Sequence, residues 1–338
     1  MKSRYLIALS CCFLFLGTTS NAVAAWSPEN LGGLSTSVYV PTTQPKLNGK
    51  RALILALHGC SLESAQEGWE GVANEYGMIV AVPIVSAIES PGNSCWANFN
   101  DGQTRTNFNN DNLLQIINTL KSRTVLNIDP DQVYLVGFSS GGGQSFTTAC
   151  VAPDIIAGFG SVDGPQLGNR ADALNYNEIK SLAACQSYSV GYEQYFDTQI
   201  ANFAGYYDDS PSSGWKKNIF NFNVTSMASI YNVDTPWPAT TPITSTATVS
   251  AATIGDKDVL SFVRVNSPSH VWPVNRTELH YPEYITEWFF KNNRRIQADE
   301  KKKPEITDYK VTVNNTSATV EGTITDEDGS IATALLSW

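Results

Sequence analysis

The chain has 338 residues and a formal net charge of −10, from 22 Lys and Arg against 32 Asp and Glu. This length fits one large domain with an appendage, or two domains. The 42 % hydrophobic residues supply enough side chains for a large core, which excludes global disorder. An acidic balance without a Lys/Arg cluster before residue 291 argues against a nucleic-acid partner or an anionic membrane surface, so a neutral substrate fits better.

Residues 1–24 have the pattern of a secretory signal peptide. Lys2 and Arg4 form a positive start, an apolar stretch follows over residues 6–16, and small residues at 22–24 suit cleavage. The apolar stretch is too short for a stable membrane anchor. A lipoprotein signal using Cys11 is the alternative, but apolar residues continue past that cysteine. We therefore expect a secreted protein, extracellular or periplasmic, with no membrane contact after the signal is removed.

Export to an oxidising compartment would allow the cysteines of the mature chain to form disulfides. Cys60, Cys95, Cys150 and Cys185 remain after removal of the signal, and four cysteines in an oxidising compartment predict two disulfides. The sequence leaves all three pairings open. Because no CxxC pair is present, a zinc site or a redox motif is poorly supported.

Alternating strand and helix patterns fill residues 36–290. Apolar runs predict strands at 51–57, 78–83, 132–136, 158–163, 200–205 and 259–265. Amphipathic or capped segments predict helices at 61–76, 111–126, 141–150 and 282–292. A long polar loop at 86–110 has a length typical of functional loops. This β-α-β alternation predicts an α/β fold, with a mostly parallel sheet covered by helices.

The composition changes after residue 290, which we take as the end of the main α/β domain spanning 25–290. Residues 291–304 are strongly charged and predict a linker. Residues 306–313 and 317–325 alternate with period two, and a turn at 326–329 precedes a third predicted strand. Residues 305–338 therefore resemble an incomplete immunoglobulin-like β module. The acidic turn could alternatively belong to a calcium loop, but a plain turn fits better.

A serine in a G-x-S-x-G pattern is the central chemical signal. Gly137-Phe138-Ser139-Ser140-Gly141 follows a predicted strand and precedes a predicted helix, the setting of a nucleophile elbow. The glycines permit a cramped turn that lifts the Ser139 hydroxyl above the sheet, and the helix N-terminus favours developing negative charge. The competing interpretation is a Gly/Ser-rich turn without chemistry.

A nucleophilic serine needs a base and a carboxylate that orients it, in the chain order Ser, acid, His. His270 is the preferred base because it lies in a loop after the last predicted strand. His280, at the start of the last helix, is the alternative, whereas His58 precedes the serine and suits a structural role.

Asp208 is the preferred carboxylate because it follows the strand at 200–205, at the carboxyl end where such sheets hold functional groups. Asp209 and Asp163 remain as alternatives. For the oxyanion hole we expect the backbone N–H groups of Ser140 and Cys60, the latter in the loop after the strand at 51–57.

Four motifs in order carry a family resemblance: LHGC at 57–60, SCW at 94–96, VGFSSGGG at 136–143 and HVWP at 270–273. Together they resemble secreted poly(3-hydroxybutyrate) depolymerases and esterases over roughly residues 36–290. The resemblance implies an α/β-hydrolase fold and the triad Ser139, Asp208 and His270. It further implies Cys60–Cys95 and Cys150–Cys185 bridges. Ser269 and Val274-Asn275 depart from the glycines usual in the family, which concerns the shape of the acyl pocket.

These expectations combine into a serine esterase that hydrolyses 3-hydroxybutyrate-type polyester or oligoester bonds through an acyl-enzyme, without metal or organic cofactor. Trp96 and Trp272 are candidate walls for an apolar acyl chain, although core packing is nearly as good an account of each. The C-terminal module is a candidate contact with a polymer surface. Two alternatives stay open: an acetylxylan or feruloyl esterase, and a non-catalytic binding protein on a hydrolase scaffold.

Overall fold

The computed structural model describes residues 24–60, 66–86, 94–168, 178–206, 214–235, 240–266, 270–275, 277–296, 305–314 and 317–325. The predicted signal peptide lies outside these ranges apart from its last residue. Within the ranges, no helix combines the length and apolarity needed to cross a bilayer.

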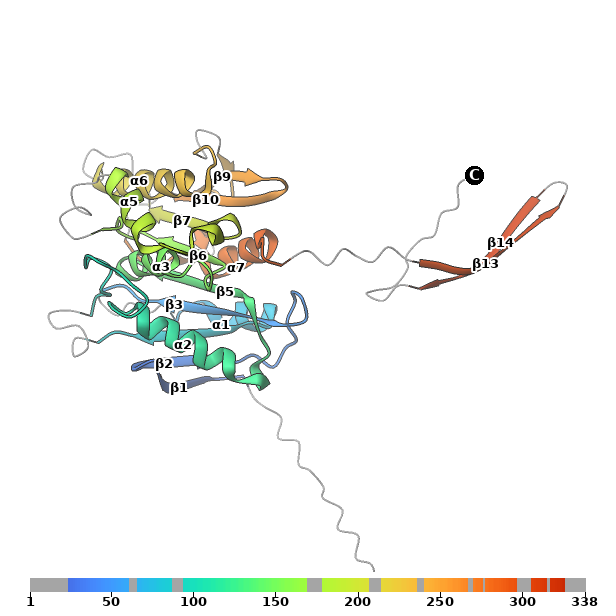
Figure 1. The fold of residues 1–338 in the computed structure, drawn as a ribbon, viewed down its shortest axis with the longest axis horizontal. Helices are drawn as coiled ribbons and strands as arrows, with labels where there is room; N and C mark the ends of the chain where they lie inside the picture. The colour runs from blue at the N-terminus through green and yellow to red at the C-terminus, as the bar shows by residue number, and fades with distance from the viewer. Residues whose placement is uncertain are drawn as a thin grey trace, which may run out of the picture.

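A single ten-stranded sheet forms the centre of the main body (Figure 1). Its six middle strands, β4-β3-β5-β6-β7-β10, are all parallel, and antiparallel strands extend both edges. In spatial order the strands are β1 (Trp26–Leu31), β2 (Leu34–Tyr39), β4 (Ile79–Ile84), β3 (Arg51–Leu57), β5 (Ile128–Phe138), β6 (Gly158–Val162), β7 (Ile200–Tyr206), β10 (Lys257–Val265), β9 (Ala247–Ile254) and β8 (Thr241–Pro242).

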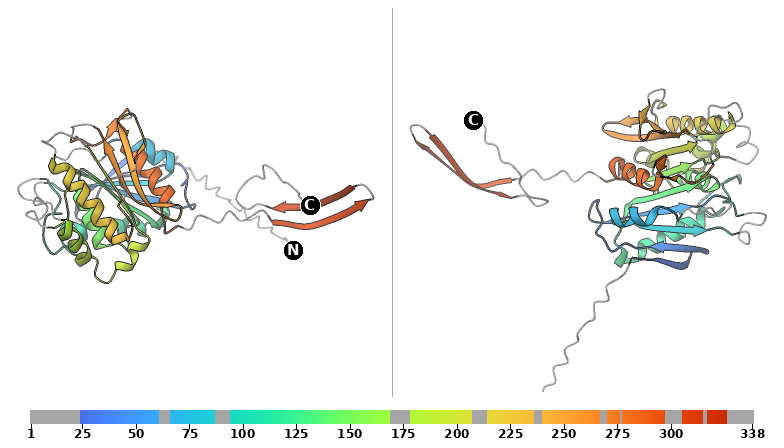
Figure 2. Two further views of the ribbon diagram at one scale, coloured as in Figure 1. Left: turned by 90° about the horizontal axis from the view of Figure 1, so that it is seen from above. Right: turned by 180° about the vertical axis from the view of Figure 1, so that it is seen from behind.

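Helices cover both faces of this sheet, so the protein has three layers. Figure 2 shows α1 and α7 on one face and the helices α3, α5 and α6 on the other. The helical segments are α1 (Trp69–Tyr76), α2 (Asn110–Ser122), α3 (Ser140–Val151), α5 (Glu178–Tyr188), α6 (Gly214–Tyr231), α7 (Tyr281–Asn292) and the short 3₁₀ segments Thr124–Leu126 and Glu193–Asp197. The predicted α/β architecture is therefore confirmed.

The two cores follow from the alternation of side chains along each strand. In β3, Leu53, Leu55 and Leu57 pack into one core with α2 and α3, whereas Ile54 and its neighbours at 52 and 56 pack into the other with α1 and α7. Such a strand, apolar on both faces, must lie inside the sheet. The parallel direction brings the carboxyl ends of β3, β5, β6 and β10 to one edge, where their loops meet.

Element ends agree with the sequence where local chemistry decides them. Gly77 closes α1 with φ 65°, and its N–H donates to the Ala73 carbonyl. A side chain could not replace it, because an ideal Cβ would lie 2.1 Å from the Gln44 carbonyl oxygen. The helix predicted over 111–126 ends earlier, at Ser122, because Arg123 adopts an extended ψ of 91° before a 3₁₀ turn.

The predicted start of the charged linker needs correction. Helix α7 continues to Asn292, and Asn293 is buried, with its Nδ2 donating to the Asp131 carbonyl and to the Tyr134 hydroxyl. Arg295 donates to the carbonyls of Pro153, Asp154 and Ile156. The domain built on the ten-stranded sheet therefore extends to at least residue 296. Charged and polar residues in this segment predicted an exposed linker, but Asn293 and Arg295 instead donate hydrogen bonds to backbone carbonyls of the main domain.

The first two strands after the linker are confirmed. Strands β13 (Glu305–Asn314) and β14 (Ser317–Thr325) form an antiparallel pair, which Figure 1 draws apart from the main sheet. The third strand of the predicted immunoglobulin-like module falls outside the described residues, so that module stays a prediction. A hairpin of two strands alone is only marginally stable.

Two short strands complete the described elements. β11 (Val274–Asn275) and β12 (Leu279–His280) form a small hairpin between β10 and α7. This hairpin follows directly after the segment that carries His270.

Candidate active site

The turn between β5 and α3 has the geometry of a nucleophile elbow. Ser139 adopts φ 54° and ψ −119°, a conformation rare for a residue with a side chain. Both flanking positions require glycine because backbone carbonyl groups lie too close to leave room for a Cβ atom. An ideal Cβ on Gly137 would lie 2.1 Å from the Gly141 carbonyl oxygen, and one on Gly141 would lie 2.3 Å from that of Leu57. The G-x-S-x-G pattern is therefore a packing requirement here.

His270 connects Ser139 to a carboxylate. Its Nε2 lies 3.1 Å from the Ser139 Oγ, and its Nδ1 lies 3.0 Å from the Asp163 Oδ2. A carboxylate accepts hydrogen bonds, so this arrangement favours the tautomer with the proton on Nδ1. The Nε2 lone pair is then directed at the serine hydroxyl, as a general base requires. The structure thus brings Ser139 and His270 together, as the sequence predicts.

The carboxylate in this arrangement is Asp163, one of the two alternatives. Asp163 directly follows β6 with φ 47°, and its N–H donates to the Ala204 carbonyl of β7 at 2.8 Å. Its side chain is only 2 % exposed, whereas the His270 side chain is 40 % exposed, so the carboxylate is shielded from water while one side of the imidazole stays open to it. Asp208, the preferred residue, and Asp209 lie outside the described residues. The sequence shows that an aspartate follows β6 and that another follows β7, but it does not show which of these two strand ends faces His270.

Aromatic side chains support the imidazole of His270. Its ring centroid lies 4.7 Å from that of Phe138, which the sequence analysis did not single out. Trp272 is 7 % exposed, packs against Phe138 and Tyr281, and donates from Nε1 to the Glu67 carbonyl at 3.1 Å. These contacts favour a role for Trp272 in holding the histidine segment in place, rather than as a wall for substrate.

The loop after β3 lies against the elbow. An ideal Cβ on Gly59 would be 3.1 Å from the Phe138 ring and 3.4 Å from the Ser139 Cβ, so Gly59 lets the loop approach the nucleophile. Cys60 follows in this loop, and Ser140 is the first residue of α3, where backbone N–H groups lack intrahelical partners. This proximity agrees with an oxyanion hole formed by the Cys60 and Ser140 amides, which remains a prediction.

His58 has a structural role in this loop. Its Nε2 accepts a hydrogen bond from the Val85 N–H at 3.0 Å, and its Nδ1 lies 2.6 Å from the Gly59 carbonyl oxygen. Burial lowers the pKa of His58, with the Gly59 contact opposing that shift. A neutral imidazole with its proton on Nδ1 satisfies both contacts.

Trp96 is also built into the support of this loop. It is 2 % exposed, its ring lies 5.2 Å from the His58 ring, and its Nε1 donates to the His58 carbonyl at 3.0 Å. A ring this deeply buried offers no surface to an acyl chain. The structure therefore favours the core-packing alternative for Trp96 over the predicted substrate wall.

Both predicted disulfides are present. Cys60 is bonded to Cys95, and Cys150 is bonded to Cys185. The first joins the loop after β3 to the loop that carries Trp96, and the second joins α3 to α5. The first bridge thus fixes the loop of one predicted oxyanion donor.

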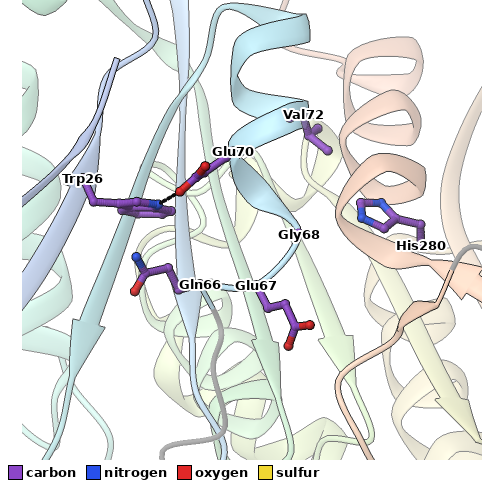
Figure 3. Close-up of a pocket in the computed structure, with 8 residues that line it drawn as sticks. Trp26, Gln66, Glu67, Gly68, Glu70, Val72 and His280 are labelled. Carbon is purple, nitrogen blue, oxygen red and sulfur yellow. Dashed lines mark hydrogen bonds between the residues drawn. The ribbon is translucent and has the colours of Figure 1, made fainter. Parts of the chain in front are cut away.

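His280, the alternative base, lies elsewhere. Figure 3 shows it across Gly68 from Trp26 and Glu70, at a cavity of about 550 Å³ beside the start of α1. His280 precedes α7, and its Nδ1 lies 3.5 Å from the carboxylate of Glu283 in the first turn of that helix. Trp26 donates from Nε1 to the Glu70 carboxylate at 2.6 Å on the other side of this cavity. His270 is therefore the histidine placed to act on Ser139.

The described residues contain no cluster of side chains that is suited to bind a metal ion. None of the described Asp, Glu, His and Cys side chains gathers in groups of three or more that could hold an ion.

The strand order and the elbow define the α/β-hydrolase fold, and comparison with solved structures agrees. An acetyl xylan esterase from Aspergillus awamori superposes with a TM-score of 0.60 at 16 % identity, covering 78 % of this chain and 98 % of that one. An S954A mutant of the feruloyl esterase module from Clostridium thermocellum, complexed with sinapinate, gives a TM-score of 0.54 at 12 % identity, covering 81 % and 89 %. At such identities the likeness concerns the fold alone.

Among curated proteins, the chain is similar to a poly(3-hydroxybutyrate) depolymerase from Ralstonia pickettii, with 28 % identity over 325 residues. The alignment covers 86 % of this chain but only 65 % of the depolymerase, so the chain spans less than two thirds of that relative. No protein-family model matches the chain. The resemblance drawn from the four motifs is thus confirmed at the level of overall sequence.

Proposed function

We propose that this protein is a secreted serine esterase that hydrolyses polyester or oligoester bonds of the 3-hydroxybutyrate type. The observation that carries the proposal is the hydrogen-bonded series from Ser139 through His270 to Asp163 at the carboxyl edge of the sheet. The substrate class is supported by similarity to the depolymerase over most of the chain. The predicted signal peptide and the two disulfides support export.

In the proposed mechanism, His270 Nε2 takes the proton of the Ser139 hydroxyl while Ser139 Oγ attacks the ester carbonyl carbon. Asp163 holds the imidazole in the required tautomer and stabilises the imidazolium that forms. The Cys60 and Ser140 N–H groups stabilise the oxyanion. His270 then gives the proton to the leaving alcohol, which produces an acyl-enzyme. Water, activated by His270, releases the acid and restores the serine.

The first experiment compares the wild-type protein with Ser139→Ala on emulsified poly(3-hydroxybutyrate), a short p-nitrophenyl ester and acetylated xylan. Clearing of the polymer that disappears in the variant supports both the nucleophile and the substrate. Serine-dependent activity on the short ester or on xylan without polymer clearing retains the esterase and refutes the depolymerase assignment. Absence of serine-dependent activity on all three substrates favours the non-catalytic alternative.

A second experiment separates the two candidate carboxylates. Asp163→Asn preserves shape but removes the acceptor charge, and we expect kcat to fall by about 10⁴-fold. We expect Asp208→Asn to retain kcat within about tenfold, the size of an indirect effect of one hydrogen bond. The reverse pattern would transfer the orienting role to Asp208, the residue that the sequence favours.

A further inference from the structure

The phenyl ring of Phe138 lies directly against the imidazole of His270. The two ring centroids are 4.7 Å apart and the ring planes are inclined by 37°, which is closer to offset stacking than to an edge-on contact. Phe138 is the last residue of β5 and immediately precedes Ser139. The turn that presents the nucleophile therefore also sets the position of an aromatic ring against the base.

The Phe138 ring is held in this position from several sides. The residue is only 2 % exposed. Gly59 approaches so closely that an ideal Cβ on it would lie 3.1 Å from the phenyl ring, and the Trp272 ring lies 6.5 Å away at an angle of 64°. Because backbone and a second aromatic ring surround it, the phenyl ring has little room to turn away from His270. Its orientation is thus fixed before the reaction begins.

The two sides of the imidazole have different surroundings. The His270 side chain is 40 % exposed, so water reaches it on the side away from Phe138. On the other side the buried phenyl ring excludes water. An aliphatic side chain in that place would only remove water from the imidazole, which disfavours the charged form. An aromatic ring differs because its face carries negative electrostatic potential and attracts a cation.

His270 carries a positive charge only during the reaction. The proton of the Ser139 hydroxyl moves to His270 Nε2, 3.1 Å away, as the Oγ–carbon bond forms, and it later leaves with the alcohol. Between these two steps the imidazole is an imidazolium ion. Asp163 stabilises this ion through the hydrogen bond at Nδ1, at the edge of the ring. The phenyl ring lies against the imidazole from a different direction.

We propose that Phe138 is a positioning residue whose ring face stabilises the imidazolium form of His270 by a cation–π interaction. The inference rests on the proposed function and deepens it. The centroid separation of 4.7 Å lies within the range of about 6 Å over which such interactions act. The neutral imidazole of the resting enzyme has no net charge, so the interaction is stronger in the transition state than before the reaction. An interaction with that property lowers the barrier to hydrolysis.

The test replaces Phe138 with phenylalanines that carry one, two or three ring fluorines. Fluorine withdraws electron density from the ring face but retains the ring and its contacts. We expect kcat/KM for a short p-nitrophenyl ester to fall with each added fluorine, by roughly five- to tenfold in total, while Tm is unchanged. The loss should appear equally in kcat, because the interaction acts on the transition state. Phe138→Leu should lose at least as much activity.

Two controls separate the charge interaction from packing. A 4-methylphenylalanine at position 138 is bulkier than the monofluorinated residue but keeps an electron-rich face, so we expect it to retain kcat/KM within about twofold. Phe289 is a second buried phenylalanine, stacked on Tyr134 at 4.3 Å. It adjoins Gly158 at the start of β6, whereas Asp163 follows the end of that strand. Three fluorines on Phe289 should leave kcat/KM unchanged.

Three results would overturn the inference and indicate a ring that only packs. These are a loss of kcat/KM that follows side-chain size rather than fluorine number, an equal loss on fluorination of Phe289, and fluorinated Phe138 variants with wild-type activity. Activity that depends on Ser139 but not on fluorine would leave the proposed function intact. If the wild-type protein shows no Ser139-dependent hydrolysis of any ester, the proposed function itself fails.

Discussion

The two disulfides provide an internal comparison between stability and catalysis. Both join cysteines 35 residues apart, so the loop-closure model assigns each the same stabilisation, about 4 kcal/mol. They differ in location: Cys60 lies in the loop that approaches Ser139, whereas Cys150 and Cys185 are fully buried between α3 and α5. Removing either bridge should therefore cost similar stability but different activity.

We expect the double variant Cys60→Ala/Cys95→Ala to lose about 4 kcal/mol of unfolding free energy and 10- to 100-fold in kcat. The loss in kcat is smaller than the 10²- to 10³-fold cost of deleting one oxyanion donor, because the loop keeps its other contacts through His58 and Trp96. Cys150→Ala/Cys185→Ala should lose at least as much stability, since it also leaves a small cavity in the core, but should retain kcat within about threefold.

The assays are urea unfolding followed by circular dichroism, and hydrolysis of a short p-nitrophenyl ester at 20 °C, where both variants should remain folded. Equal losses of kcat in the two double variants at matched folded fractions would refute the link between the Cys60–Cys95 bridge and the oxyanion loop. A greater loss of kcat in the Cys150/Cys185 variant would refute it as well.

Three further predictions concern the scaffold. Gly141→Ala should abolish soluble folded protein or activity, because its Cβ would lie 2.3 Å from the Leu57 carbonyl, whereas Gly71→Ala in α1 has open space and should raise stability by about 0.5–1 kcal/mol in thermal unfolding. Burial lowers the pKa of His58 in the folded protein, so below about pH 6.5 the unfolded chain binds a proton on this histidine more readily than the folded protein does. The free energy of unfolding is therefore highest above pH 6.5 and decreases as the pH falls below that value. We expect His58→Gln to reduce the drop in Tm between about pH 7.5 and 5.5. Arg295→Met should cost roughly 3 kcal/mol in urea unfolding, since it leaves buried carbonyls without donors, and an unchanged midpoint would contradict that role.

Much of the fold could be predicted because strands buried on both faces are distinctive in sequence. The apolar runs that became β3, β4, β5 and β10 were identified within a few residues. Edge strand β1, with the sequence WSPENL, and β9 were missed because they alternate weakly and carry polar residues. Helix α6 was missed as well, because its apolar residues do not form one clear stripe.

At the site, the sequence identified Ser139 and His270 because chain order and motif constrain both. The carboxylate is harder, since any aspartate at the carboxyl end of a neighbouring strand satisfies the pattern, and selection depends on where the His270 loop folds back. The importance of Phe138 could not be predicted, because its ring contact with His270 exists only once distant segments pack together.

The edges of the ten-stranded sheet bear on how the protein behaves at high concentration. An outer strand with free backbone groups can recruit a strand from another molecule, which leads to aggregation. Here β1 carries Pro28, and Glu29 is paired with Arg123, while β8 at the opposite edge has only two residues and includes Pro242. Proline lacks the donor that a new strand would need. Both edges therefore carry features that oppose pairing with a strand of a second molecule where protein molecules are crowded.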